Sequence, residues 1–265
     1  MSYYAGIDLG SISSEAVVLE NGDIAGRCVI RTRADQEATA KEALTTALPD
    51  DRSPDEVDYV VSTGYGRTKA RNSVADEEVT EITAQCRGIA SKLPETDLVI
   101  DVGGQDTKVI RHDGDGGVDD FRLNEKCAAG TGRFIEVLAD ALDVSLDEIG
   151  DAKVEDDPSL SSYCTVFAES EVISLRSEGY AEPVIASAVN RSFANKVAGQ
   201  AKRLHVDGDT VAVTGGMALN GAFVAFLEAE LETDVHVPDS PQTTCAYGSA
   251  LIARQRAVRP TAEAD

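Results

Sequence analysis

Hydrophobic positions along the chain follow two periods, one typical of β-strands and one typical of α-helices. Short apolar runs predict strands at residues 3–9, 16–19, 24–32, 57–62, 97–101, 108–110 and 210–214. Apolar residues spaced by three or four predict helices at about residues 36–48, 79–93, 183–204, 221–231 and 246–257, and two more that begin near residues 130–133 and at Cys164. The polar stretch 147–161 predicts a loop, with Ser145 placed to cap a short turn.

One short pattern occurs twice in the first half of the chain. Ile-Asp-Leu-Gly-Ser at residues 7–11 matches Ile-Asp-Val-Gly-Gly at residues 100–104, and in both a strand ends in Asp before a glycine turn and a second strand. Glycine lets the backbone approach an anion, so such a turn suits a phosphate and a water bound to Mg²⁺. A single copy is also typical of a plain hairpin. Two copies predict a duplicated unit that holds a phosphate between its halves.

A cysteine and a glycine-rich turn precede the predicted helix that begins near residues 130–133. Cys127 is followed by Gly130, Thr131 and Gly132. The start of a helix carries N–H groups and a partial positive charge, which favour a phosphate, a thiolate or a metal–sulfur cluster. A buried cysteine beside a glycine turn is the alternative. Cys164 also stands at the start of a predicted helix, on which Val166, Phe167, Ser170, Ile173 and Ser174 share a face.

A third glycine turn follows the predicted strand at residues 210–214. Gly215, Gly216 and Met217 lie between that strand and the predicted helix at residues 221–231. A strand, two glycines and a helix in this order suit a backbone pressed against a nucleoside. The sequence therefore predicts a nucleotide-binding protein.

The composition restricts the classes of function. Asp and Glu number 47 against 24 Lys and Arg, and the formal net charge is −23, so nucleic acid would be repelled. An ordinary acidic protein with a solvated surface is one reading, and we favour the hypothesis of a halophilic cytoplasm in which salt screens the charge. No run of 18 apolar residues indicates a membrane span, and the first residues do not form a signal peptide. The five cysteines are too scattered for a disulfide scaffold, and they suggest packing, metal or redox chemistry.

These motifs together resemble the BadF/BadG/BcrA/BcrD ATPase family of the actin/hexokinase/Hsp70 superfamily, and within it the activators (archerases) of 2-hydroxyacyl-CoA dehydratases. The resemblance runs from Gly6 to Ala253. Its most specific segments are residues 124–134, 164–174, 101–106 and 63–67.

The resemblance implies an α/β fold of the actin or ribonuclease H-like type, with two lobes of duplicated βββαβα type and a nucleotide cleft between them. The first lobe would comprise residues 1–95 and about 243–265. The second would comprise residues 96–242 and carry the cysteines.

The resemblance also implies how ATP would be bound. Asp8 and Asp101 would lie near Mg²⁺, and Gln105 would orient the attacking water. The phosphates would contact Gly10 and Ser11 on one loop, with Gly103, Gly104 and Gln105 on the other. Gly215 and Gly216, followed by Met217, would lie against the adenosine.

A homodimer with one [4Fe-4S] cluster is implied as well, with Cys127 and Cys164 of each chain as the ligands. A cluster of this kind takes four thiolates, and each chain would supply two of them. A two-fold dimer would therefore complete the ligand set. The family's electron donor is a reduced ferredoxin or flavodoxin. Its acceptor is an iron–sulfur dehydratase or reductase that acts on an acyl-CoA.

Three positions depart from the family pattern. Glu15 stands where many relatives have Lys, so charge neutralisation at the phosphates is in doubt. Gln85 replaces a common His, and Cys245 replaces a common Gly.

Three other functions remain open at this point. The ATPase subunit of a benzoyl-CoA reductase type enzyme would share the same motifs. A small-molecule kinase on the same fold would need a catalytic Asp and no cluster. A nucleotide-binding protein that has lost hydrolysis is suggested only by Glu15.

Overall fold

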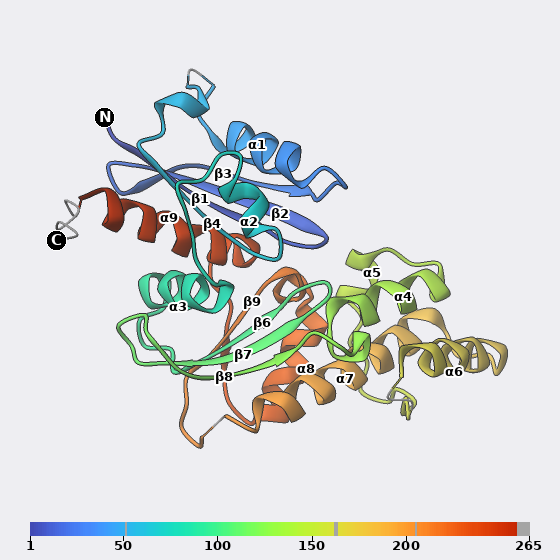
Figure 1. The fold of residues 1–265 in the computed structure, drawn as a ribbon. Coiled ribbons are helices and arrows are strands. Elements are labelled where there is room, and N and C mark those ends of the chain that lie inside the picture. The colour runs from blue at the N-terminus through green and yellow to red at the C-terminus, as the bar shows by residue number, and fades with distance from the viewer. Residues whose placement is uncertain (51, 162–163, 205, 259–265) are drawn as a thin grey trace. The chain divides into compact units, whose positions relative to one another are not determined.

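The structure is a computed structural model that describes residues 1–50, 52–161, 164–204 and 206–258 (Figure 1). The chain divides into two compact units. Unit 1 comprises Met1–Glu95, His112–Val118 and Gln242–Asp265, and unit 2 comprises Thr96–Arg111 and Asp119–Pro241.

Unit 1 is built on a five-stranded sheet in the order β3-β2-β1-β4-β5. Its strands are β1 (Tyr3–Leu9), β2 (Ser13–Glu20), β3 (Asp23–Arg31), β4 (Tyr59–Thr63) and β5 (Glu77–Glu78). The hairpin strands β1, β2 and β3 pair antiparallel, whereas β4 runs parallel to both β1 and β5. Its helices are α1 (Gln36–Ala47), α2 (Arg67–Arg71), α3 (Glu81–Lys92) and α9 (Thr244–Val258), with 3₁₀ turns η1 (Pro54–Glu56) and, at the border with unit 2, η4 (Pro241–Thr243).

Successive side chains of β1 point to opposite faces of this sheet, so the strand contributes to the hydrophobic core on each face. Tyr3, Ala5 and Ile7 join the core under α1, whereas Tyr4 joins the core against α9. Gly6 faces α9 so closely that an added Cβ atom would lie 2.0 Å from the Ala246 carbonyl oxygen. The glycine therefore lets the last helix pack directly on the first strand (Figure 1).

Unit 2 is built on a second five-stranded sheet, in the order β10-β9-β6-β7-β8. Its strands are β6 (Leu98–Val102), β7 (Thr107–His112), β8 (Val118–Asn124), β9 (Val211–Thr214) and β10 (Val235–His236). The β6–β7 pair is antiparallel, and β9 runs parallel to β6 and β10. Its helices are α4 (Gly132–Leu142), α5 (Leu146–Gly150), α6 (Thr165–Ser177), α7 (Glu182–Ala201) and α8 (Gly221–Leu231), with 3₁₀ turns η2 (Ala128–Gly130) and η3 (Gly216–Leu219).

Three phenylalanines form the centre of the unit 2 core. Phe134 of α4 stacks on Phe193 of α7 with ring centroids 6.0 Å apart, and Phe193 contacts Phe223 of α8 at 5.1 Å. All three rings are fully buried, and apolar residues of β6 and β9 pack against them in one cluster. This packing fixes α4 and α7, the two helices that matter most for the site.

The strands and helices predicted from hydrophobic periodicity are present, but two short α-helices and three strands of the described chain were missed. The stretch after Ser145, predicted as a loop, begins with α5, because Ser145 and Glu148 form a capping box. Helix α2 and strands β5 and β10 are too short to give a periodic signal. Strand β8 was also missed, since six of its seven residues are exposed and it carries little apolar alternation.

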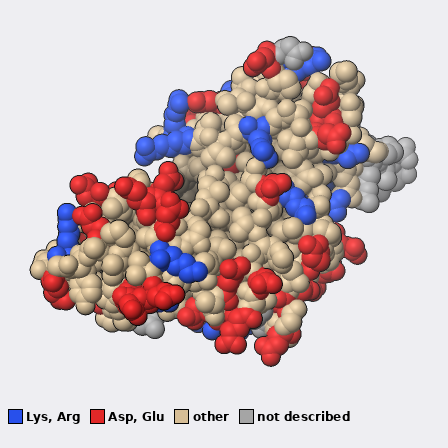
Figure 2. All heavy atoms as spheres, turned by 180° about the vertical axis from the view of Figure 1, so that it is seen from behind, with Lys and Arg blue, Asp and Glu red and all other residues tan. Residues whose placement is uncertain are grey.

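Acidic side chains are spread over the surface shown in Figure 2, with fewer basic ones among them. Among the described helices, none combines the length and apolar character required to cross a lipid bilayer.

Candidate functional site

The first glycine turn follows β1 in unit 1 and is held by hydrogen bonds from a neighbouring strand end. Thr32 Oγ1 donates to the Gly10 carbonyl oxygen at 2.8 Å and lies 2.7 Å from Ser14 Oγ. A Cβ atom on Gly10 would lie 2.6 Å from the Ser13 carbonyl oxygen, so the turn requires glycine there. Ser11 is exposed at its tip. The turn is thus a rigid backbone element with an accessible hydroxyl.

The two hairpins place unlike charges at equivalent positions. Asp8 lies directly opposite Glu15 in the β1–β2 pair, and Asp101 lies directly opposite Lys108 in the β6–β7 pair. Residues that face each other across an antiparallel pair project from the same side of the sheet. The first hairpin therefore brings two carboxyl groups together, and Glu15 is buried. The second hairpin brings a carboxylate and an ammonium group together.

Asp101 is held in place by two neighbours in unit 2. Thr214 Oγ1 donates to Asp101 Oδ1 at 2.8 Å, and Lys108 Nζ lies 3.4 Å from Asp101 Oδ2. Lys108 also pairs with Asp106 at 2.8 Å, and the Gly103 N–H donates to the Asp106 carbonyl oxygen at 3.0 Å. These bonds close the turn and leave Gln105 exposed at its tip. An exposed amide beside a fixed carboxylate can reach a ligand or a water.

The second glycine turn is joined to the start of α4. The N–H groups of Gly132 and Arg133 donate to the carbonyl oxygens of Gly103 and Gly104, each at 2.9 Å. A Cβ atom on Gly132 would lie 3.1 Å from the Gly103 carbonyl oxygen, so only glycine fits this contact without displacement. The predicted anion site at the start of α4 thus has two of its N–H groups bonded to protein carbonyls. This link between turn and helix could not be seen in the sequence.

The remaining predicted glycines lie beside this link. Gly215 has φ +81°, and a Cβ atom there would lie 2.4 Å from the Val102 carbonyl oxygen. Thr131 is buried and donates through Oγ1 to the Ala128 carbonyl oxygen. Gly216 and Met217 begin η3, and Met217 Cγ lies 3.6 Å from the Cβ position of Gly132. Unit 2 therefore gathers the turns after β6 and β9 and the start of α4 at one place.

Both predicted metal ligands are exposed cysteines in unit 2. Cys127 is the N-cap residue of η2, and Asn124 bonds to both its backbone N–H and its carbonyl oxygen. Cys164 is the N-cap residue of α6. The thiol of Cys164 thus lies at the positive end of a helix of 13 residues, which favours an anionic ligand set.

The donor set fits half of a four-thiolate metal–sulfur cluster. In the part of the chain that the structure describes, no group of three or more His, Cys, Asp or Glu side chains is arranged to hold a metal ion. Two accessible thiols are half the number that a [4Fe-4S] cluster takes. Of the other cysteines, Cys28 is half-buried and Cys86 and Cys245 are buried.

One cation near these thiols was missed in the sequence. Burial lowers the pKa of Lys196, on α7, to about 8, and the charges of Cys127, Glu171 and Cys164 oppose this effect. One ammonium group therefore lies within electrostatic reach of both thiols. No motif marks Lys196, because only the packing of α7 brings it there.

Helix α6 turns an apolar face toward solvent. Val166, Phe167 and Ile173 are 66%, 68% and 52% exposed, whereas Ala168 and Val172 form the buried face. The face predicted from the helical spacing is therefore the outer one, and it begins next to Cys164. Neighbouring apolar side chains on a surface are typical of a contact site for another protein.

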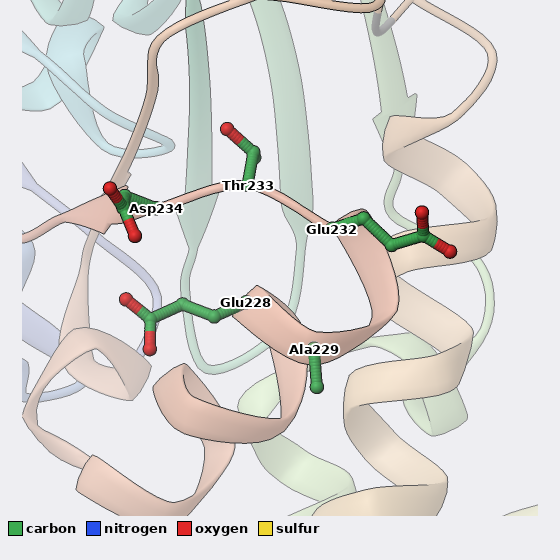
Figure 3. A pocket seen from close by; sticks show the side chains of 5 residues that line it. All are labelled: Glu228, Ala229, Glu232, Thr233 and Asp234. Carbon is green, nitrogen blue, oxygen red and sulfur yellow. The ribbon is translucent and has the colours of Figure 1, made fainter.

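An open hollow elsewhere in unit 2 does not coincide with any predicted site residue. Its lining comes from the end of α8 and the connection that leads to β10, namely Glu228, Ala229, Glu232, Thr233 and Asp234 (Figure 3). Glu228 Oε1 accepts a hydrogen bond from the Val235 N–H at 3.2 Å. Glu228 thus has a structural contact, and the lining of the hollow includes no residue of the glycine turns.

Two departures from the family pattern lie in the core of unit 1. Gln85 on α3 is buried, and Cys245 Sγ lies 3.7 Å from the Glu81 carbonyl oxygen. Cys245 stands in the first turn of α9, where α9 packs on α3 through Gly248. Cys245 therefore joins two helices rather than lining a turn.

Each unit has a five-stranded mixed sheet and a β-hairpin whose first strand carries an Asp near its end, followed by a glycine turn. This duplicated arrangement defines the actin-like ATPase fold. Solved structures of that class share it, and the predicted fold is confirmed. The chain belongs to the BadF/BadG/BcrA/BcrD ATPase family, whose pattern it matches over residues 5–253.

Two kinds of function are represented among its relatives. The activator of lactoyl-CoA dehydratase from Anaerotignum propionicum is 42% identical over 262 residues, which cover 96% of this chain and 98% of that protein. A benzoyl-CoA reductase subunit from Thauera aromatica is 31% identical over 265 residues, with 95% and 93% covered. A solved structure, the activator of the 2-hydroxyisocaproyl-CoA dehydratase from Clostridium difficile with bound ADPNP, has a TM-score of 0.89 at 36% identity and covers 98% of this chain and 100% of that one.

Proposed function

We propose that this ATPase is the activator of a 2-hydroxyacyl-CoA dehydratase and that it uses ATP hydrolysis to deliver a low-potential electron. The observation that carries the proposal is the pair of exposed thiols, Cys127 and Cys164, at the starts of η2 and α6. The similarity to an activator of lactoyl-CoA dehydratase supports the choice of partner.

Cys127 and Cys164 would supply two of the four thiolates of a [4Fe-4S] cluster, which supplies one-electron chemistry when bound. The same two residues of a second copy would supply the other two, so the active form would be a two-fold homodimer. The exposed face of α6, formed by Val166, Phe167 and Ile173, begins beside Cys164 and is proposed as part of the contact with that copy.

ATP would be held by the glycine turns. Gly10 and Ser11 in unit 1, with Gly103 and Gly104 in unit 2, are proposed to contact the phosphates. Asp8 and Asp101 would bind Mg²⁺ through its waters, and the exposed Gln105 would orient the water that attacks the terminal phosphate. The ADPNP in the similar activator structure supports nucleotide binding.

The link between the second turn and α4 offers a route from the nucleotide to the thiols. A shift of Gly103 and Gly104 on ATP binding would move the start of α4 through the two 2.9 Å hydrogen bonds. Cys127 lies immediately before η2, which leads into α4. The state of the nucleotide would thereby change the position of one thiol relative to the other.

The proposed partners are those that the family resemblance implies. A reduced ferredoxin or flavodoxin would donate the electron, and the dehydratase would accept it near the exposed thiols. The high negative charge excludes a nucleic-acid partner on electrostatic grounds.

The first test is the metal content of the protein purified without oxygen. We expect about two iron atoms and two sulfide ions per chain, because a dimer shares one four-iron cluster. Cys127→Ser and Cys164→Ser should each lose the iron while ATP binding stays near the wild-type level.

Cys28→Ser is the matched control, because Cys28 lies in unit 1 with its Sγ donating to the Ala43 carbonyl oxygen, which a serine hydroxyl could also contact. This variant should keep its iron. A wild-type protein that stays free of iron after anaerobic reconstitution would rule out the electron-transfer function.

The second candidate is the ATPase subunit of a benzoyl-CoA reductase type enzyme, favoured by the similarity to the Thauera aromatica protein. Both candidate functions would use the same ATPase fold and the same two thiols. Isolation of a stable homodimer that stimulates a separate dehydratase supports the activator. Isolation in a permanent complex with other reductase components supports the alternative.

A further inference from the structure

Lys196 is held over an aromatic ring next to the proposed cluster site. Its Nζ atom lies 3.7 Å from the ring centroid of Phe134, which stands in the first turn of α4. At this distance the ammonium group is attracted by the negative face of the ring. Phe134 is fully buried and stacks on Phe193, so the position of the ring is set by the core. The contact with this ring favours one position of the Lys196 ammonium group.

The helix that carries Lys196 contacts both thiol-bearing segments. Helix α7 packs against η2, which follows Cys127, and against α6, which follows Cys164. Gln200, one turn after Lys196, reaches the η2 side: its Nε2 lies 2.6 Å from the Cβ position of Gly130. This placement explains why the charges of Cys127 and Cys164 oppose the lowering of the Lys196 pKa.

Other charged groups near the thiols differ from Lys196 in burial. Lys126, beside Cys127, is exposed, and Arg133 is exposed and pairs with Glu136 at 2.9 Å. Solvent and salt screen such charges. Lys196 is half-buried, so its field is screened less. Glu171 on α6 is an opposing charge that acts on Lys196, and its Oε1 accepts hydrogen bonds from Ser161 N and Oγ, both at 3.0 Å.

We infer that the positive charge of Lys196 raises the reduction potential of the metal–sulfur centre that Cys127 and Cys164 would hold. The inference rests on the proposed function. Reduction adds one electron to the centre and breaks no bond, so a nearby cation stabilises the reduced form more than the oxidised form. Glu171 acts in the opposite direction.

The test is the midpoint potential of the iron-loaded, full-length protein, measured by anaerobic redox titration with optical and EPR detection. In Lys196→Met the reduced form should be roughly tenfold less favoured, which is a potential about 59 mV more negative for a one-electron couple. Lys196→Arg keeps the charge over the ring and should stay near wild type. Lys126→Met removes one positive charge from an exposed site nearby and should change the potential much less.

Glu171→Gln gives a second measurement of opposite sign that does not depend on Lys196→Met retaining its cluster. Loss of this carboxylate should shift the potential to a more positive value. Iron content is determined first. An iron-free wild-type protein would contradict the proposed function itself, and with it the inference about Lys196. Iron-loaded Lys196→Met with a wild-type potential overturns the inference. An equal shift in Lys196→Arg also overturns it, because packing on Phe134 and not charge would then be the cause.

Discussion

At the scale of single residues, the two glycine hairpins show how a duplicated motif can diverge in charge. The sequence alone revealed the repeat and its two aspartates, because their spacing from the glycine turns is the same. It could not show that Glu15 lies opposite Asp8 while Lys108 lies opposite Asp101, since that depends on strand register. Unit 1 thus has no lysine at the position that Lys108 occupies in unit 2.

Glu15→Lys should give the first hairpin the charge pair of the second. A lysine opposite Asp8 would neutralise a carboxylate near the proposed phosphate site, so we expect the KM for ATP to fall by roughly tenfold. Steady-state ATPase rates as a function of ATP and Mg²⁺ concentration measure the change.

Glu78→Lys is the control for this experiment. Glu78 is exposed on β5 of the same unit, and its substitution alters the net charge by the same amount. An unchanged or higher KM in Glu15→Lys, with Glu78→Lys at the wild-type value, would show that Glu15 does not face the nucleotide.

At the scale of elements, the start of α4 is the part of the site that sequence reasoning described least completely. The motif predicted a helix after a glycine turn, and the structure has α4 from Gly132. General rules suggested free N–H groups at that helix start. Two of them instead bond to the turn at Gly103 and Gly104, a contact between segments about thirty residues apart that no local pattern encodes. The position of Lys196 was hidden for the same reason.

Thr107 tests how much this junction depends on a single hydrogen bond. Its Oγ1 donates to the Gly130 carbonyl oxygen at 2.7 Å, and the side chain is fully buried. Thr107→Val keeps the shape but leaves the carbonyl without this donor, so we expect a loss of about 1–3 kcal/mol in the free energy of unfolding. Urea denaturation measures it.

Thr107→Ser retains the hydroxyl and serves as the matched variant. It should lose less stability than Thr107→Val, because only a methyl group is removed. Equal losses in the two variants would mean that packing, and not the hydrogen bond, stabilises this junction.

At the scale of the whole molecule, the net charge of −23 is the dominant property. Acidic side chains dispersed over the surface repel one another, and this repulsion destabilises the folded chain unless salt screens it (Figure 2). We propose that the protein is adapted to concentrated salt. This hypothesis rests on the excess of acidic residues in the composition, and the fold itself does not require it.

The stability of the protein should therefore rise with ionic strength. The Debye length falls from about 10 Å at 0.1 M to about 3 Å at 1 M, so most surface repulsion is screened in molar KCl. We expect the urea midpoint to increase steadily over that range. A midpoint that is already maximal in dilute buffer would contradict the halophilic hypothesis.

The contact between Gly132 and the Gly103 carbonyl oxygen has a consequence for how such proteins can evolve. A side chain at position 132 would push the two segments apart, because its Cβ atom would lie 3.1 Å from that oxygen. The cysteines, exposed at helix starts, are under no comparable steric restraint. A homologue could therefore replace both cysteines without disturbing this junction, whereas a larger residue at position 132 would require the turn at Gly103 to shift.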